Sequence, residues 1–229
     1  MRALDPFAVI ADATGRGRRG ERVGSYVALG DSFTAGRGTE PGQRWTDRLA
    51  ASLRAHHPEV AYHNLAVDGA TSGDVLEQVG PALQLEPDLV TVICGANDVI
   101  WSVRPDLDLY GERLAEIFDR LRSGLPRVAI LTATSPERWR FLELRPRTRA
   151  RIVAGIERLN EVTRTVAASR SVPVVDVVGH PGLDEAENFL ADGLHPSSTG
   201  HERAAVEFAR ALREHFGIES DVSDEEEDR

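Results

Sequence analysis

Ser32 stands at the end of an apolar run and lies between two glycines, Gly30 and Gly36. The run over residues 25–29 is typical of a buried strand, so the serine is expected at the carboxyl edge of a sheet, where open α/β proteins bind their ligands. A serine in that place acts as a nucleophile only when a histidine, an acid and oxyanion donors converge on it. Other segments of the chain must therefore supply these partners.

Asp192 and His195 offer an acid and a histidine at a workable spacing. Three residues apart on one turn, the carboxylate can reach the Nδ1–H of the imidazole, fix its tautomer and leave Nε2 free to take the serine proton. The other histidines fall at helix ends, inside a helix or strand, or after a strand with no acid three residues before. A metal site of Asp192, His195 and His201 is an alternative, but no H-E-x-x-H or other ligand spacing supports it, so we expect no metal.

Apolar and amphipathic segments alternate five times along the chain. Strands are predicted over residues 24–29, 60–67, 88–94, 128–131 and 172–178. Helices are predicted over 43–57, 72–85, 105–125 and 150–169, with a short one over 184–190 and a last one that ends near 216. Ser72 or Asp74 is the expected cap of the second helix, and Ser197 or Ser198 that of the last.

This alternation predicts an α/β fold with three layers, α/β/α, around a five-stranded parallel sheet. The expected strand order is the flavodoxin-like 2-1-3-4-5. In that order the second and third strands flank the first, so the loops after these three strands meet at one switch point. The same loops carry Ser32, Gly69 and Asn97.

Composition narrows the function further. A chain of 229 residues, 41% of them hydrophobic, fits one globular domain, and a net charge of −10 makes nucleic acid a poor partner. The chain contains no lysine, which excludes lysine-based covalent chemistry. The only cysteine, Cys94, lies in an apolar run and is expected to be an inert core thiol.

The chain divides into a lead-in over residues 1–22, one domain over 23–217 and an acidic tail over 218–229 that is expected to be disordered. Residues 15–20 match G-x-G-x-x-G, but a dinucleotide site needs a strand before it, so we expect no cofactor. No apolar stretch has the length of a signal peptide or a membrane span. We therefore expect a cytoplasmic protein without an integral membrane segment. The sequence leaves the oligomeric state open, and a monomer is the favoured expectation.

Four short motifs follow one another within residues 24–216: Gly30-Asp31-Ser32-Phe33, then Gly69, then Gly95-Ala96-Asn97-Asp98, and last Asp192-Gly193-Leu194-His195-Pro196. In this order they resemble the blocks of the SGNH hydrolase superfamily, also called the GDSL esterase/lipase family. The G-x-S-x-G elbow of the α/β-hydrolases is absent from the sequence.

The resemblance implies a role for each residue in ester hydrolysis. Ser32 would be the nucleophile, His195 the general base and then acid, and Asp192 the residue that orients the imidazole. The oxyanion would be held by the backbone N–H groups of Ser32 and Gly69 and by the side-chain amide of Asn97. No metal or organic cofactor is implied. Asp31 and Asp98 are interpreted as residues that order their loops.

We predict a serine esterase acting on small-molecule esters with small or medium acyl groups, with lipase-like and thioesterase-like activity included. A carbohydrate O-deacetylase or an acyltransferase would use the same triad, and a catalytically silent binding protein is the third alternative. Trp101 and the arginine-rich segment 135–149, which carries Trp139 and Phe141, are expected near the site. That segment forms either a lid that favours acidic or amphipathic substrates or an ordinary charged helix face.

Overall fold

The structure, a computed structural model, describes residues 22–137 and 141–220. Residues 1–21 of the lead-in, which include the glycine motif, lie outside the described residues, as do Trp139 and residues 221–229 of the acidic tail. The domain limits at 22/23 and 217/218 therefore stay predictions. Ile218, just past the second limit, packs in the core with 6% of its surface exposed.

Within the described residues, five parallel strands form one sheet in the order β2-β1-β3-β4-β5, which confirms the predicted order. They are β1 (Ser25–Gly30), β2 (Ala61–Asn64), β3 (Leu89–Ile93), β4 (Ala129–Ala133) and β5 (Val174–Val175). The strands predicted over 60–67 and 172–178 were too long. Both lie at an edge of the sheet and pair with one neighbour only, so the ladder ends sooner than the apolar run does.

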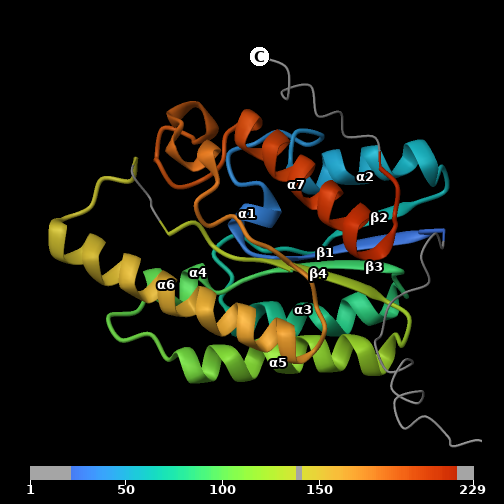
Figure 1. Ribbon diagram of the computed structural model, residues 1–229, viewed down its shortest axis with the longest axis horizontal. Helices are drawn as coiled ribbons and strands as arrows, with labels where there is room; N and C mark the ends of the chain where they lie inside the picture. Colours follow the sequence, from blue (N-terminus) through green and yellow to red (C-terminus); the bar gives the residue numbers. More distant parts are fainter. Residues whose placement is uncertain (1–21, 138–140, 221–229) are drawn as a thin grey trace, which may run out of the picture.

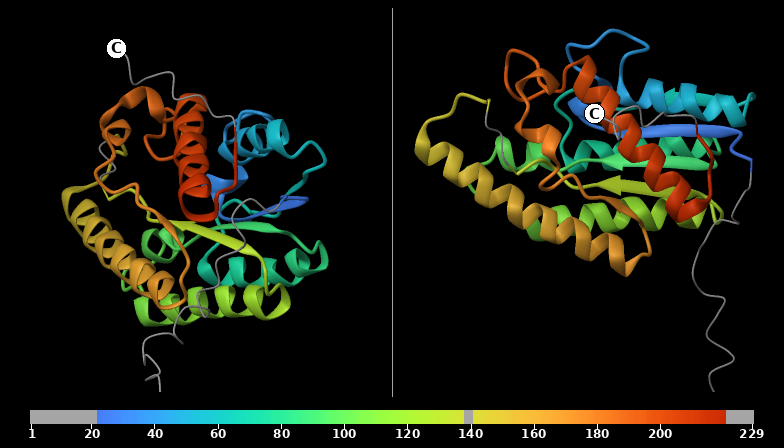
Figure 2. Two further views of the ribbon diagram at one scale, coloured as in Figure 1. Left: turned by 45° about the vertical axis from the view of Figure 1, so that its right-hand side comes forward. Right: turned by 45° about the horizontal axis from the view of Figure 1, so that its top comes forward.

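Helices cover both faces of this sheet (Figure 1). On one face lie α2 (Trp45–His56) and α7 (Ser198–Phe216), and on the other lie α3 (Ser72–Gln84), α5 (Leu107–Gly124) and α6 (Pro146–Ser169). Each layer has its own apolar core against the sheet. Figure 2 shows the sheet between the two layers from two further directions. The predicted three-layer α/β/α fold is thus confirmed.

Local hydrogen bonds move several predicted helix ends. Thr71, rather than Ser72 or Asp74, caps α3, because its hydroxyl and the Asp74 carboxylate each accept from the other residue's backbone N–H. The helix predicted from residue 150 already begins at Pro146, since proline suits a first helical turn. Ser197 caps α7 by accepting from the Gly200 N–H, as one of the two predicted candidates.

Two short helices follow neighbouring strands where the prediction had only loops. α1 (Ser32–Ala35) comes directly after β1, and α4 (Ala96–Ile100) follows β3. Because β1 and β3 pair in parallel, both helices begin at the same edge of the sheet. The short helix predicted over 184–190 is wrong: two 3₁₀ turns, Pro181–Asp184 and Ala186–Asn188, take its place. None of the described helices combines the length and the apolar character that a membrane crossing requires.

Gly95 precedes α4 in the left-handed region, with φ of 110°, and a β-carbon there would lie 2.5 Å from the Tyr110 ring. Gly95→Ala is expected to lose about 1–2 kcal/mol of stability to the backbone and about 1–3 kcal/mol more to the displaced ring. Gly179→Ala is the matched control, because its φ is 78° but the space around it is open. Thermal unfolding compares the two variants. Equal losses would contradict a close contact between Gly95 and Tyr110.

Candidate active site

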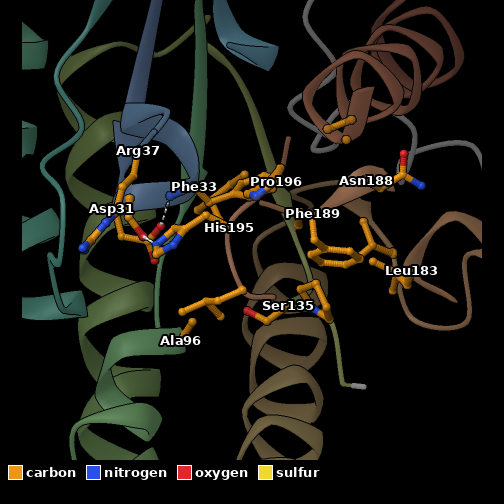
Figure 3. Close-up of a pocket in the computed structure, with 18 of the residues that line it drawn as sticks. Asp31, Phe33, Arg37, Ala96, Ser135, Leu183, Asn188, Phe189, His195 and Pro196 are labelled. Carbon is orange, nitrogen blue, oxygen red and sulfur yellow. Dashed lines mark hydrogen bonds between the residues drawn. The ribbon is translucent and has the colours of Figure 1, made fainter. Parts of the chain in front are cut away.

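The five residues singled out from the sequence line one cavity at the carboxyl edge of the sheet. Ser32 begins α1, Asn97 lies in the first turn of α4, and Gly69 lies in the loop between β2 and α3. Asp192 and His195 come from the loop before α7. Figure 3 shows the His195 side chain in the middle of this cavity, with Asp31 and Arg37 on one side and Leu183 and Phe189 on the other. The fold therefore brings together segments that are far apart in the sequence.

A chain of hydrogen bonds links the serine, the histidine and the aspartate. The Oγ of Ser32 lies 3.0 Å from Nε2 of His195, and the opposite ring nitrogen, Nδ1, lies 2.6 Å from Oδ2 of Asp192. His195 is buried, with 8% of its surface exposed, whereas Ser32 is partly exposed toward the cavity. This geometry lets the imidazole exchange a proton with the hydroxyl while the carboxylate faces the other ring nitrogen.

The Asp192 carboxylate is held in place by its own turn. Its Oδ1 accepts hydrogen bonds from the backbone N–H groups of Leu194 and His195, at 2.9 and 3.0 Å. Burial alone would raise the pKa of Asp192, but the hydrogen bonds from the His195 ring and from these two N–H groups lower it overall. The carboxylate is therefore ionised when it faces the imidazole. The spacing of three residues predicted this contact.

Asn97 and Gly69 belong to two loops that are tied together. The Asn97 side-chain Nδ2 donates to the carbonyl of Ala70, the residue after Gly69, at 2.9 Å. Asp98 adds a second tie, because its carboxylate accepts from the backbone N–H and the hydroxyl of Ser72 at 2.8 and 2.6 Å. The predicted loop-ordering role of Asp98 agrees with these contacts. Gly69 itself is exposed in a turn with φ of 79°.

Asp31 caps the short helix that Ser32 begins. Its Oδ1 accepts from the Phe33 N–H at 3.0 Å, and only 4% of the residue is exposed. Burial raises the pKa of this carboxyl to about 7, the Phe33 N–H opposes the rise, and the charges of Asp98 and Asp68 add to it. The contact agrees with the loop-ordering role predicted for Asp31. Near neutral pH, part of the protein therefore carries an uncharged carboxyl directly beside Ser32.

Two buried amides that sequence reasoning missed hold the backbone at the cavity floor. Gln78 of α3 accepts from the Gly30 N–H at 2.8 Å and donates to the Gly30 carbonyl at 2.9 Å. Asn160 of α6 makes the same pair of bonds with Ser135, after β4, at 2.8 and 2.9 Å. Each amide thereby fixes the backbone at the end of a strand, Gly30 of β1 and Ser135 just after β4. A polar residue on the buried face of an amphipathic helix was the available signal.

His201 does not join the site. Its Nδ1 accepts a hydrogen bond from the Trp45 N–H at 3.3 Å, and its ring lies 5.9 Å from that of Phe33. Burial lowers the pKa of His201 to about 4, so it is neutral at ordinary pH. In the described ranges, no three His, Cys, Asp or Glu side chains are grouped so as to hold a metal ion.

The cavity has a volume of about 380 Å³ and extends well beyond Ser32. From the serine it extends between the ends of β4 and β5, the two 3₁₀ turns and α7, and we call this region the inner part of the cavity. Its apolar lining residues are Val175, Val177, Leu183, Phe189, Ala204 and Phe208. Trp101 lies on the outer part, where the sequence placed it. Of the arginine-rich segment, Ser135 and Pro136 line the cavity, and the Phe141 ring lies 5.4 Å from that of Phe189.

The fold has three layers, and a cavity at the carboxyl edge of its sheet holds a hydrogen-bonded Ser–His–Asp chain. This combination is typical of serine hydrolases with an α/β fold. A family model described as the GDSL-like lipase/acylhydrolase family matches residues 28–203 of the chain. The chain belongs to this family, as the motif resemblance predicted, and it is a hydrolase that acts on esters.

Curated relatives and solved structures support this assignment at low sequence identity. A GDSL lipase of Mycobacterium tuberculosis is 26% identical over 200 residues, which cover 82% of this chain and 81% of the relative. A lipase of Streptomyces rimosus is 25% identical over 221 residues, covering 78% and 82% of the two chains. The crystal structure of a lipase/acylhydrolase from Enterococcus faecalis is similar with a TM-score of 0.67 and 25% identity, covering 87% and 99%.

Asp31→Asn tests the charge state of the buried carboxyl. The raised pKa means that the folded protein binds more protons than the unfolded chain between about pH 4 and 7, so stability falls as pH rises through this window. The substituted amide would still accept from the Phe33 N–H but would carry no charge. The variant should therefore melt at a higher temperature than the wild type above pH 7 and lose this advantage toward pH 4.

Asp74→Asn is the control for that experiment, because the pKa of Asp74 is lowered whereas that of Asp31 is raised. Hydrogen bonds from the Thr71 side chain and backbone lower the pKa of Asp74, so its stabilising effect is present at neutral pH and disappears as pH falls. Thermal unfolding monitored from about pH 2 to 8 compares both variants, because the stabilising effect of Asp74 disappears only as the pH falls below about 4. A melting temperature of Asp31→Asn that stays below that of the wild type at every pH would contradict the raised pKa.

Proposed function

We propose that the protein is a serine esterase that works through an acyl-serine intermediate. The observation that supports this most directly is the hydrogen-bonded chain from Ser32 through His195 to Asp192, inside a cavity. The family membership defines the reaction class, and the chain of contacts suggests which atoms carry it out. A silent binding protein would have no need for three polar groups aligned in this order.

In the proposed reaction, Ser32 Oγ attacks the ester carbonyl and its proton passes to Nε2 of His195. The imidazolium is stabilised by Asp192, which stays ionised. When the tetrahedral intermediate collapses, the ester C–O bond breaks and His195 returns the proton to the leaving alcohol. Water then attacks the acyl-serine with His195 again as base, which releases the acid and restores the serine.

The negative charge of both tetrahedral intermediates falls on the former carbonyl oxygen. We assign its stabilisation to the backbone N–H groups of Ser32 and Gly69 and to the side-chain amide of Asn97. All three residues line the cavity, and the bond from Asn97 to Ala70 connects the second and third donors. Such donors are effective because they are already oriented when the charge develops.

The inner part of the cavity suits the acyl group of the ester. Its walls are mainly apolar side chains, among them Val175 and Phe208, which are 6% and 1% exposed. The cavity lining also includes the polar side chains of His180, Arg203 and Glu207. The alcohol must leave and water must enter while the acyl group remains on Ser32, so an enclosed space is compatible with the acyl group rather than with the alcohol. An apolar pocket of this size fits a small or medium aliphatic chain. The cytoplasmic location and the monomeric state remain predictions from the sequence.

Ser32→Ala tests the nucleophile. The variant should lose at least about three orders of magnitude in kcat on p-nitrophenyl butyrate, because the activated hydroxyl is removed while the fold is retained. Ser123→Ala, on the exposed end of α5, is the control and should retain full activity. Steady-state kinetics and a far-UV circular dichroism spectrum complete the measurement. Substantial turnover by a folded Ser32→Ala protein would exclude the proposed nucleophile.

Leu183→Trp tests the site of the acyl chain by filling the inner part of the cavity. The ratio of kcat/KM for p-nitrophenyl octanoate to that for the acetate should fall by about tenfold or more, because only the longer chain reaches the new ring. Leu109→Trp places the same ring on the outer surface of α5, where 38% of Leu109 is exposed, and should leave the ratio unchanged. An unchanged ratio in Leu183→Trp would place the acyl chain elsewhere. A preference for acetylated sugar over every simple ester would favour the O-deacetylase alternative.

A further inference from the structure

The side-chain amide of Asn97 is fixed at both of its ends. Its Nδ2 donates to the carbonyl of Ala70 at 2.9 Å, and its Oδ1 accepts from the indole Nε1 of Trp101 at 3.0 Å. Reversing the amide would set oxygen against the Ala70 carbonyl and N–H against the indole N–H. The two contacts together therefore select one orientation of a group whose two ends have almost the same shape.

We propose that Trp101 is a positioning residue that holds the Asn97 amide in the orientation required for binding the oxyanion. This inference rests on the proposed function, because it assumes that the Asn97 amide binds the oxyanion. An amide nitrogen carries two hydrogens, and Ala70 accepts one of them. With the carbonyl end fixed by Trp101, the second hydrogen is left for the substrate oxygen.

The spacing along α4 explains how the indole reaches the amide. Trp101 follows Asn97 by four residues, which places their side chains on the same side of a helix. The backbone N–H of Trp101 also donates to the Asn97 carbonyl at 3.1 Å and so continues the helical turn. Side chain and backbone of the tryptophan are thus both bonded to Asn97, which is 7% exposed.

A charged side chain from a different helix supports the loop that carries the indole. The guanidinium of Arg151, in α6, donates to the carbonyls of Val99, at 3.0 Å, of Ile100, at 3.4 Å, and of Ser102. Val99 and Ile100 are the last two residues of α4, whose carbonyls lack partners within the helix, and Ser102 follows Trp101 directly. Arg151 of α6 therefore fixes the backbone around Trp101, while the indole N–H donates to Asn97.

Exposure argues against a purely structural reason for the tryptophan. Trp101 is 75% exposed, so its ring contributes little to the core, yet it lines the cavity beside the proposed oxyanion donor. A substrate bound in the cavity would exclude water from the contact between Trp101 and Asn97, and a hydrogen bond shielded from water is stronger. The fixation of the amide would then be greatest when the reaction occurs.

The experiment separates the indole N–H from the apolar ring. Trp101→Phe retains a ring without the donor, and replacement of Trp101 by benzothienylalanine exchanges only the N–H for sulfur. Both should lower kcat on p-nitrophenyl butyrate by about tenfold, less than the loss of about 10²-fold or more expected for Asn97→Ala, with KM nearly unchanged. Val103→Ala removes a neighbouring side chain that is 80% exposed and should retain the kcat of the wild type.

The possible outcomes decide between the roles of Trp101. The midpoint of thermal unfolding should remain that of the wild type in both tryptophan variants, so that a lower kcat reports the site and not the fold. Wild-type kcat in the benzothienylalanine protein would overturn the proposal, as would a raised KM with unchanged kcat in Trp101→Phe, which would make the ring only a wall for substrate. If instead Ser32→Ala remained active, the proposed function would fail on separate grounds.

Discussion

The hydrogen bond of 3.0 Å between Ser32 and His195 joins residues that are 163 positions apart, and the arrangement of the site depends on it. It exists because Ser32 begins α1 directly after the end of β1, which β2 and β3 flank. The loop that carries His195 lies just before α7, which packs beside α2 and places this loop at the same edge of the sheet. In the proposed reaction, Asp192 orients a ring that the fold has already brought to the serine. The topology of the sheet and the proposed catalysis are thus linked through one contact.

The parts of this arrangement that follow from general rules could be predicted from the sequence. Ser32, Gly69 and Asn97 each come after an apolar run, and parallel strands end at a common edge, so the three had to meet once the strand order was right. The pairing of Asp192 with His195 follows from a spacing of three residues. The strand order and the pairing were predicted from three signals: hydrophobic periodicity, glycine and proline at the ends of elements, and short spacings between polar residues. Each of these signals is local in the sequence.

Contacts that depend on tertiary packing escaped prediction. Gln78 and Asn160 bond to strand ends 48 and 25 residues away. A polar residue on a buried helix face indicates that it has a partner, but not which backbone group that partner is. The extent of β5 depends on where β4 offers a partner, so an apolar run could not delimit it. The hydrogen bond from Trp101 to Asn97 depends on the helical turn of α4. This helix was not predicted, because Gly95 directly before it is typical of a loop. The residues that position the site are therefore less visible in the sequence than those proposed to react.

Covalent labelling of the wild-type enzyme with a fluorophosphonate, followed by peptide mass spectrometry, tests the proposed nucleophile most directly. Phosphonylation needs an activated nucleophile and donors for the phosphoryl oxygen, which are the two properties assigned to this cavity. If Ser32 is the nucleophile, we expect one adduct per chain, on Ser32, together with complete loss of esterase activity. An adduct on another residue, or full inactivation with Ser32 unmodified, would contradict this role of Ser32.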